Sequence, residues 1–207
     1  MNRNDTSQNE YISKLKNSDF TLITRDCVGG ILYHQLKMKF LSPTINLFFT
    51  PEDFNLFCLN LKKYIDAELK EFKEDKVPYP VGSLSPKGLP SIKVYFMHYK
   101  TFKESKEKWD ERKKRINYDK IFVISSFCYS TEVPTLSDKL ISDWNKIPYQ
   151  KVVLVDKKYG FDDEYIIKKN PKCEEFAWLL YQPSKTITWK RTFNDFDFIN
   201  FLNKSEK

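Results

Sequence analysis

Two adjacent glycines are the first residues whose type and position could carry chemistry. The chain has only five glycines among 207 residues, and two of them are Gly29 and Gly30. They follow a β-rich run, Phe20–Thr24, and precede a helical pattern over Ile31–Leu36. A glycine pair in this position lets a ligand approach the backbone and directs the amides of a helix N-terminus at an anion. The pair suits the diphosphate of a nucleotide-activated donor, and it also fits a tight turn that needs a positive φ.

A cysteine and a histidine are the candidate catalytic residues. Cys27 lies in the same predicted turn, where a helix N-terminus would lower the pKa of its thiol and make it a nucleophile. The alternative is that a small residue is needed there. His98 ends the apolar run Ile92–His98, where the chain leaves the predicted sheet, and open α/β sheets bind ligands outside the carboxyl ends of their strands. Histidine suits a general base, so His98 is a candidate base or else a structural residue, whereas His34, inside a helical pattern, is interpreted as structural.

Cations close the charged helix that we predict over 102–115. Arg112 and Arg115, near Asn117, either grip a phosphate through a bidentate fork or complement the dipole at the helix C-terminus. Asp195-Phe-Asp197 has the form of the DxD metal motif of nucleotide-sugar transferases, but it opens a predicted terminal helix, where acidic residues serve as caps. The four cysteines, at 27, 58, 128 and 173, lack paired short spacings, and two histidines are too few for a histidine-rich site. We therefore predict no metal centre.

The elements that must position these residues alternate between strand and helix. This order predicts an α/β fold: one three-layer, Rossmann-like domain with a mostly parallel or mixed central sheet and helices on both faces. We place this domain at residues 20–207, after a polar lead-in at 1–19. The expected central strands are 20–24, 92–97, 120–126 and 152–155, and the helices packing on them are 52–73 and 102–115. The other predicted elements are a hairpin of 79–84 with 92–98, a crossover helix at 135–145 that makes a right-handed βαβ unit, a strand at 165–167 and a terminal helix at 195–202.

Composition excludes several classes of protein. Hydrophobic residues make up 41% of the chain, enough for a core, and no apolar run approaches the roughly 18 residues of a membrane-spanning helix. The polar stretch Met1–Glu10 lacks the apolar centre of a signal peptide, so we expect a cytoplasmic protein. The net charge of +7 is spread among interleaved acids and bases. The chain is also rich in Lys, Asn, Ile, Phe and Tyr, as AT-rich genomes encode. The charge therefore indicates no nucleic-acid partner.

A series of short motifs extends from Phe20 to the C-terminus. The motifs are Cys27-Val-Gly-Gly30, Tyr33-His34, Phe40-Leu-Ser-Pro-Thr-Ile-Asn-Leu-Phe48, Pro51-Glu-Asp-Phe54, Tyr79-Pro-Val-Gly82, Met97-His-Tyr-Lys100 and Trp109-Asp-Glu-Arg-Lys-Lys-Arg-Ile-Asn117. In combination they resemble the bacterial family known as domain of unknown function 1919. Arg25-Asp26 stands where many members carry an Asn pair.

The resemblance implies a role in surface-glycan assembly. Members of the family often lie among genes for capsule, exopolysaccharide or lipopolysaccharide synthesis, and some are described as acetyltransferases or glycosyltransferases. The candidate catalytic residues are then His98 and Cys27. The candidate substrate- or phosphate-binding residues are Gly29, Gly30, Tyr33, Ser42, Thr44, Arg112, Arg115 and Asn117.

Three functions remain open at this point. The first is a glycosyltransferase in which the glycine pair and Arg112 or Arg115 bind the donor diphosphate while His98 activates the acceptor hydroxyl. The second is an acyltransferase that uses Cys27 as nucleophile or His98 as direct base, and the third is a non-catalytic binding protein of a glycan pathway. We favour the first, because a Cys–His pair without a third orienting group is an incomplete triad. We expect a small-molecule or glycan substrate and no cofactor besides a nucleotide-sugar donor. We expect no nucleic-acid partner and no transmembrane segment, while peripheral membrane association and oligomeric state stay open.

Overall fold

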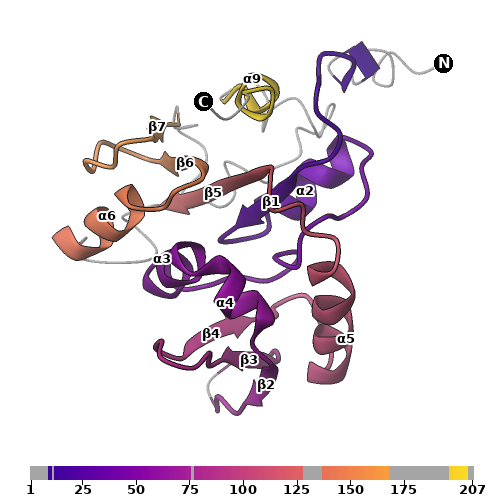
Figure 1. Ribbon diagram of the computed structural model, residues 1–207, viewed down its shortest axis with the longest axis vertical. Coiled ribbons are helices and arrows are strands. Elements are labelled where there is room, and N and C mark those ends of the chain that lie inside the picture. Colours follow the sequence, from indigo (N-terminus) through magenta and orange to yellow (C-terminus); the bar gives the residue numbers. More distant parts are fainter. Residues whose placement is uncertain (1–8, 11, 76, 128–136, 168–195, 205–207) are drawn as a thin grey trace.

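A parallel four-stranded sheet, sheet A, forms the centre of the computed structural model, which describes residues 9–10, 12–75, 77–127, 137–167 and 196–204 (Figure 1). The strands are β1 (Thr21–Thr24), β5 (Ile121–Phe127), β6 (Gln150–Val155) and β7 (Glu164–Ile166), paired in the order β1-β5-β6-β7. Every residue of β5 is buried, which is the pattern of a strand covered on both faces. The predicted strands at 20–24, 120–126, 152–155 and 165–167 are thus confirmed as neighbours in one sheet.

Helices cover both faces of sheet A. α2 (Val28–Gln35) and α9 (Phe198–Leu202) pack on the face that carries Leu22, Phe122 and Leu154. α3 (Pro51–Leu59) and α6 (Asp138–Asn145) pack on the opposite face, with Val123 and Val153. Figure 1 shows α9 and α3 on opposite sides of the sheet. The predicted three-layer α/β architecture is confirmed.

The crossover from β5 to β6 confirms the predicted βαβ unit. β5 and β6 are parallel and in register from Phe122 opposite Gln150 to Phe127 opposite Val155. α6 begins after Ser137, whose hydroxyl accepts a hydrogen bond from the Leu140 amide at 3.2 Å. The predicted start at 135 lies outside the described residues.

A second, antiparallel sheet, sheet B, lies beside the first and corrects one prediction. It contains β2 (Leu69–Phe72), β3 (Val81–Leu84) and β4 (Ile92–Tyr95). The predicted hairpin is present as β3 and β4, but the assignment of 92–97 to the central sheet is wrong. Buried and half-buried residues alternate along β4, as expected for an antiparallel strand covered on one face, whereas every residue of β5 is buried.

The helix predicted over 52–73 is also wrong in its second half. α3 begins as expected, with Thr50 as N-cap accepting from the Asp53 amide at 3.2 Å. It stops because Asn60 leaves the helical conformation (φ −130°, ψ 38°), and α4 (Leu61–Asp66) follows as a separate helix. Ala67 is extended, and Leu69 enters β2 opposite Leu84. The apolar spacing that predicted one long helix therefore runs through two helices and a strand.

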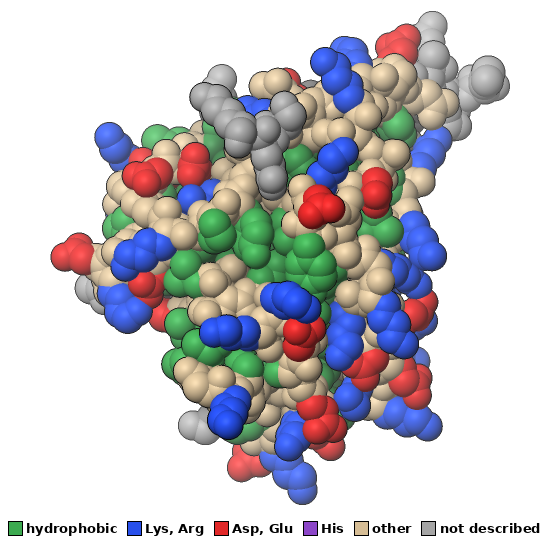
Figure 2. All heavy atoms as spheres, in the orientation of Figure 1, with side chains coloured by type: hydrophobic (Ala, Val, Ile, Leu, Met, Phe, Trp, Pro, Cys, Tyr) green, Lys and Arg blue, Asp and Glu red, His purple; other side chains and the backbone are tan. Residues whose placement is uncertain are grey.

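α5 (Phe102–Lys113) confirms the predicted charged helix. Thr101 caps it by accepting from the Glu104 amide at 3.2 Å, and Trp109 is its buried anchor, packed against Phe57 and Phe96. Figure 2 shows positive and negative side chains interleaved over this part of the surface, while hydrophobic side chains gather between the two sheets. Among the helices in the described part of the chain, none is long and apolar enough to cross a membrane.

Candidate functional site

The carboxyl ends of β1 and β5 carry a cluster of polar residues, which we call the edge cluster: the buried Arg25 and Ser126 and the half-buried Asp26. Arg25 is only 4% exposed, and it donates from Nη2 to Ser126 Oγ at 3.4 Å and from Nη1 to the Phe49 carbonyl at 3.5 Å. The Ser126 hydroxyl donates to Asp26 Oδ2, and Asp26 Oδ1 accepts from the Val28 amide at 3.0 Å. Open α/β sheets bind ligands outside this edge, so the edge cluster lies where the fold predicts a site.

The glycine pair lies inside α2 and not in a turn before it. The glycines with positive φ are Gly88 and Gly160, so backbone conformation does not explain Gly29 and Gly30. Packing does: a Cβ on Gly29 would lie 2.6 Å from Thr24 Oγ1. The pair therefore lets α2 start close against β1. As the second and third residues of the helix, these glycines present amides that have no intrahelical acceptor.

Cys27 is the half-buried N-cap residue of α2. Burial, and to a lesser extent the Asp26 carboxylate, raise the pKa of its thiol from 9.0 to about 12. The sequence predicted the opposite direction, because it considered the helix N-terminus and not the loss of water around the sulfur. The thiol is therefore protonated at neutral pH.

His98 lies exposed in the turn that follows β4. Because β4 belongs to sheet B, the reasoning that placed His98 at the carboxyl edge of the central sheet is wrong. The next residue, Tyr99, donates from its hydroxyl to the Ile45 carbonyl at 3.1 Å, and Ile45 is one of the residues that face Gly30. The turn is thereby tied to the segment that packs on α2. A role for His98 as general base stays a prediction.

The two arginines after Trp109 take different partners. Arg112 donates from Nη1 to Tyr99 Oη at 2.7 Å, and its guanidinium carbon lies 5.1 Å from the centroid of the Phe40 ring. Arg115 donates to the Phe40 carbonyl at 3.1 Å and pairs with Glu111. Tyr99 joins His98, Arg112 and the segment beside α2, yet sequence reasoning missed it. It stands in the motif Met97-His-Tyr-Lys100, but one tyrosine among twelve gives no spacing signal.

Ser42 and Thr44 complete the free edge of β1. Thr44 Oγ1 accepts from the Thr24 amide at 3.0 Å and donates to the Leu22 carbonyl at 3.3 Å. The Ser42 hydroxyl contacts Thr44 Oγ1 at 2.9 Å, and both side chains are fully buried. β1 is an edge strand, whose open backbone groups need such partners. These contacts account for both residues structurally.

Tyr33 and Asn117 also hold the backbone around β1. The buried Tyr33 hydroxyl donates to the Phe20 carbonyl and accepts from the Leu22 amide, both at 2.9 Å. The Asn117 amide donates to Thr21 Oγ1 at 2.9 Å. Two of the predicted binding residues are thus linked through Tyr99 and Ile45: Arg112 donates to Tyr99, and Gly30 faces Ile45. The other four stabilise β1 and its surroundings: Tyr33, Ser42, Thr44 and Asn117.

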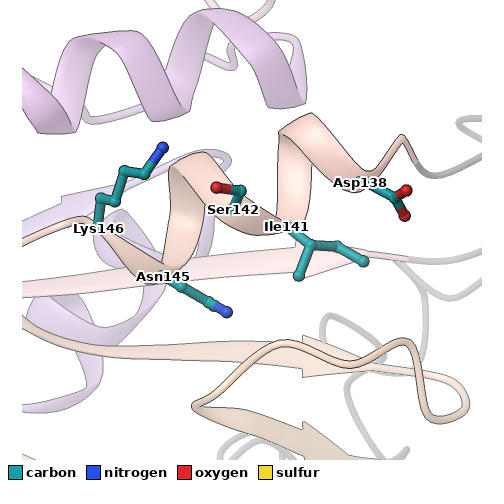
Figure 3. Close-up of a pocket in the computed structure, with 5 residues that line it drawn as sticks. All are labelled: Asp138, Ile141, Ser142, Asn145 and Lys146. Carbon is teal, nitrogen blue, oxygen red and sulfur yellow. The ribbon is translucent and has the colours of Figure 1, made fainter.

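A shallow hollow of about 460 Å³ runs along α6 (Figure 3). Its lining residues lie on α6 and on the C-cap residue Lys146, at spacings of three and four, so it has a single wall. It includes none of the predicted site residues, and we do not place the site there. Its lining residues are Asp138, Ile141, Ser142, Asn145 and Lys146.

One residue of the motif Asp195-Phe-Asp197 acts as the predicted helix cap. Asp197 caps α9 by accepting from the Asn200 amide at 2.9 Å, whereas Asp195, Cys128 and Cys173 lie outside the described residues. Within the described ranges, no three His, Cys, Asp or Glu side chains are grouped so that they could hold a metal ion.

Together, the parallel sheet and the edge cluster define an α/β protein with a polar site at the carboxyl edge. The chain belongs to the family described as domain of unknown function (DUF1919), whose model matches residues 2–203. It is similar to a protein of Haemophilus influenzae described as uncharacterized, with 29% identity over 194 residues, which is 92% of this chain and 87% of the relative. Family membership confirms the resemblance seen in the motifs, and neither description states a reaction.

Proposed function

We propose that the protein is a glycosyltransferase of bacterial surface-polysaccharide assembly that uses a nucleotide-activated sugar as donor. The observation that carries this proposal is the edge cluster, in which an arginine that is 4% exposed stands at the carboxyl ends of β1 and β5. α2 starts beside it. Asp26 already supplies one anion here, because it pairs with Arg25 at 4.0 Å and accepts from the Val28 amide at 3.0 Å. The next amides of the helix N-terminus, those of Gly29 and Gly30, favour a second anion, and a nucleotide sugar carries its diphosphate as the leaving group. The polysaccharide pathway is inferred from the family resemblance.

The proposed reaction is a displacement at the anomeric carbon of the donor sugar. The acceptor hydroxyl oxygen attacks this carbon, and the bond from the carbon to the diphosphate oxygen breaks with its electron pair on the nucleoside diphosphate. His98 takes the proton from the acceptor hydroxyl, and its exposed turn allows a glycan to approach from solvent. Negative charge grows on the leaving diphosphate, and the amides of Gly29 and Gly30, together with the guanidinium of Arg112 or Arg115, stabilise it.

The acyltransferase alternative through Cys27 is disfavoured by the state of the thiol. A covalent acyl-enzyme requires a thiolate nucleophile. Because burial raises the pKa of the Cys27 thiol to about 12, the thiol stays protonated at pH 7. Acyl transfer with His98 as direct base remains the second candidate, and it differs from the first in its donor.

A thermal-shift screen of nucleotide sugars against acyl-CoA compounds tests the proposal. A ligand at 100 times its dissociation constant adds about 2.7 kcal/mol, which corresponds to about 5–10 °C for a chain of this size. We expect nucleotide sugars to raise the melting temperature. Stabilisation by acyl-CoA alone would support the alternative, and stabilisation by neither would refute both enzyme proposals.

A matched pair of serine variants locates the binding. Ser126→Ala removes the hydroxyl that links Arg25 to Asp26, and it should reduce the shift given by a nucleotide sugar. Ser85→Ala makes the same chemical change in the exposed loop between β3 and β4, where the Ser85 hydroxyl donates to Ser91 Oγ at 2.9 Å. It should leave the shift unchanged. Equal shifts in the two variants would place the ligand elsewhere.

A further inference from the structure

The Arg112 guanidinium forms no ion pair with a carboxylate of the described residues, unlike the side chains of Lys113 and Arg115. Lys113 pairs with Asp110 at 3.0 Å, and Arg115 pairs with Glu111. In the part of the chain that the structure describes, no carboxylate oxygen lies within the 4.0 Å of an ion pair from the Arg112 guanidinium. Arg112 is nevertheless half-buried. A half-buried cation without an anionic partner is a candidate to bind an anion from outside the chain.

Aromatic residues hold the Arg112 guanidinium in one place. Its carbon lies 5.1 Å from the centroid of the Phe40 ring, within the range of a cation–π contact. The Phe40 ring packs edge-on against the fully buried Tyr33, with centroids 6.1 Å apart. The Tyr99 ring packs edge-on against Phe96 at 5.6 Å. Both supports of the guanidinium are thus anchored in the core.

Arg112 lies in the last turn of α5, where its charge complements the helix dipole, but its guanidinium also makes contacts that the dipole does not explain. A cation that complements the end of a helix interacts with the last carbonyls. The Arg112 guanidinium donates to Tyr99 Oη and lies over the Phe40 ring, and these two specific contacts are not required by the dipole.

Tyr99 fixes the orientation of the guanidinium. Burial raises the pKa of its hydroxyl, so the proton is retained at neutral pH and donated to the Ile45 carbonyl at 3.1 Å. The same oxygen accepts from Arg112 Nη1. A guanidinium has five N–H donors in a planar fork, and this bond uses one of them. The remaining donors suit two oxygens of a single oxyanion.

We propose that Arg112 binds a phosphate group of the ligand and that Tyr99 is the positioning residue that holds Arg112 in place. The predicted phosphate contact thereby falls on Arg112 and not on Arg115, whose charge pairs with Glu111. Ile45, which accepts from Tyr99, faces Gly30 at the start of α2, so the phosphate would lie near both. The inference rests on the proposed function only for the molecule that carries the phosphate, a nucleotide sugar.

Calorimetric titration of the full chain with pyrophosphate and with uridine diphosphate tests the assignment. Arg112→Gln should weaken pyrophosphate binding by about 10- to 100-fold, the range for hydrogen bonds to a charged group. The pyrophosphate affinity of Arg112→Lys should lie between those of the wild type and Arg112→Gln, because lysine keeps the positive charge but lacks the planar donor fork. Lys108→Gln is the matched control, because it removes one exposed charge from the same helix, and it should change the affinity by less than about twofold.

Tyr99→Phe tests the positioning role separately from folding. It keeps the ring against Phe96 and removes the hydroxyl, so binding should weaken by about 3- to 10-fold. Thermal midpoints are measured for every variant, and Arg112→Lys serves if Arg112→Gln does not fold. An unchanged affinity in a folded Tyr99→Phe protein would overturn the positioning role.

Four other results would overturn the binding role of Arg112. The first two are no pyrophosphate binding by the wild type and wild-type pyrophosphate affinity in Arg112→Gln. The other two are a loss of pyrophosphate affinity in Arg115→Gln equal to that in Arg112→Gln, and binding of glucuronate, which offers a carboxylate in place of phosphate, as tightly as pyrophosphate. Failure of the proposed function would look different. Pyrophosphate would bind through Arg112, but no nucleotide sugar would be bound or consumed.

Discussion

Gly29→Ala tests the close approach of α2 to β1, because two physical effects predict opposite signs. Alanine is the better helix former, and at an exposed helix position the change stabilises a protein by about 0.5–1 kcal/mol. At Gly29, however, the new Cβ would lie 2.6 Å from Thr24 Oγ1 and 2.8 Å from Thr24 Cγ2. Contacts this short require a shift of one of the two elements.

The magnitude depends on whether Thr24 can move. Its side chain is fully buried, and its hydroxyl donates to the Asp26 carbonyl at 2.9 Å. Overpacking of this kind costs about 1–3 kcal/mol, which exceeds the gain in helix propensity. We expect a net loss of about 1–2 kcal/mol in the free energy of unfolding, or about 2–8 °C in melting temperature.

Urea unfolding followed by tryptophan fluorescence measures this loss, since Trp109 and Trp144 are both buried. Gly30→Ala is the matched control: its Cβ would lie 3.3 Å from Oδ1 of the exposed Asn46, which can yield, so stability should be unchanged or slightly higher. In the double mutant Thr24→Ala/Gly29→Ala the two losses should be less than additive by about 1 kcal/mol. A Gly29→Ala protein as stable as wild type would refute the packing argument.

The remaining predictions concern Tyr33, Cys27 and His98. Tyr33→Phe removes the hydroxyl that bridges Phe20 and Leu22, and it should lower the free energy of unfolding by about 1–3 kcal/mol. The control Tyr118→Phe, at an exposed position, should change this free energy little. Equal effects of the two changes would contradict the bridging role of Tyr33. The raised pKa of Cys27 keeps its thiol neutral, so its alkylation by iodoacetamide should accelerate about tenfold per pH unit from pH 7 to 10. Peptide mass spectrometry measures the alkylation rate. A plateau below pH 9 would show a lower pKa. His98→Ala should reduce turnover about 10²–10⁴-fold while Cys27→Ser has little effect, and a trapped Cys27 thioester or wild-type turnover in His98→Ala would reverse these roles.

Local sequence signals predicted the elements that are determined locally. The uninterrupted apolar run over 121–124 indicated a central parallel strand, and Thr50-Pro51 marked the start of α3. The prediction failed where a similar pattern serves two structures: Leu69 continues the helical spacing of the preceding residues, yet it pairs with Leu84 in sheet B. Whether Leu69 joins a helix or a strand depends on its pairing with β3, more than ten residues away, and the spacing of apolar residues does not indicate that pairing.

The candidate site shows the same division between local and long-range information. Gly29 and Gly30 were recognisable because glycine is scarce, but their reason, the approach of α2 to Thr24 and Ile45, needs the packed structure. Ser42 and Thr44 were predicted through the family resemblance alone. The partners of Thr44 on β1 lie about 20 residues away, and Ser42 contacts Thr44. The contact between Arg112 and Tyr99 joins a turn to a helix, and the types of the two residues do not indicate it.

The most direct test of the proposed transferase is release of the leaving group. Purified protein is incubated with a panel of nucleoside diphosphate sugars and, in parallel, with acyl-CoA compounds, each with a polysaccharide acceptor fraction, and free nucleoside diphosphate and free CoA are quantified. We predict acceptor-dependent release of a nucleoside diphosphate from one sugar donor and loss of that release in His98→Ala. Release of CoA in place of nucleoside diphosphate, or release from neither donor class, would contradict the proposal.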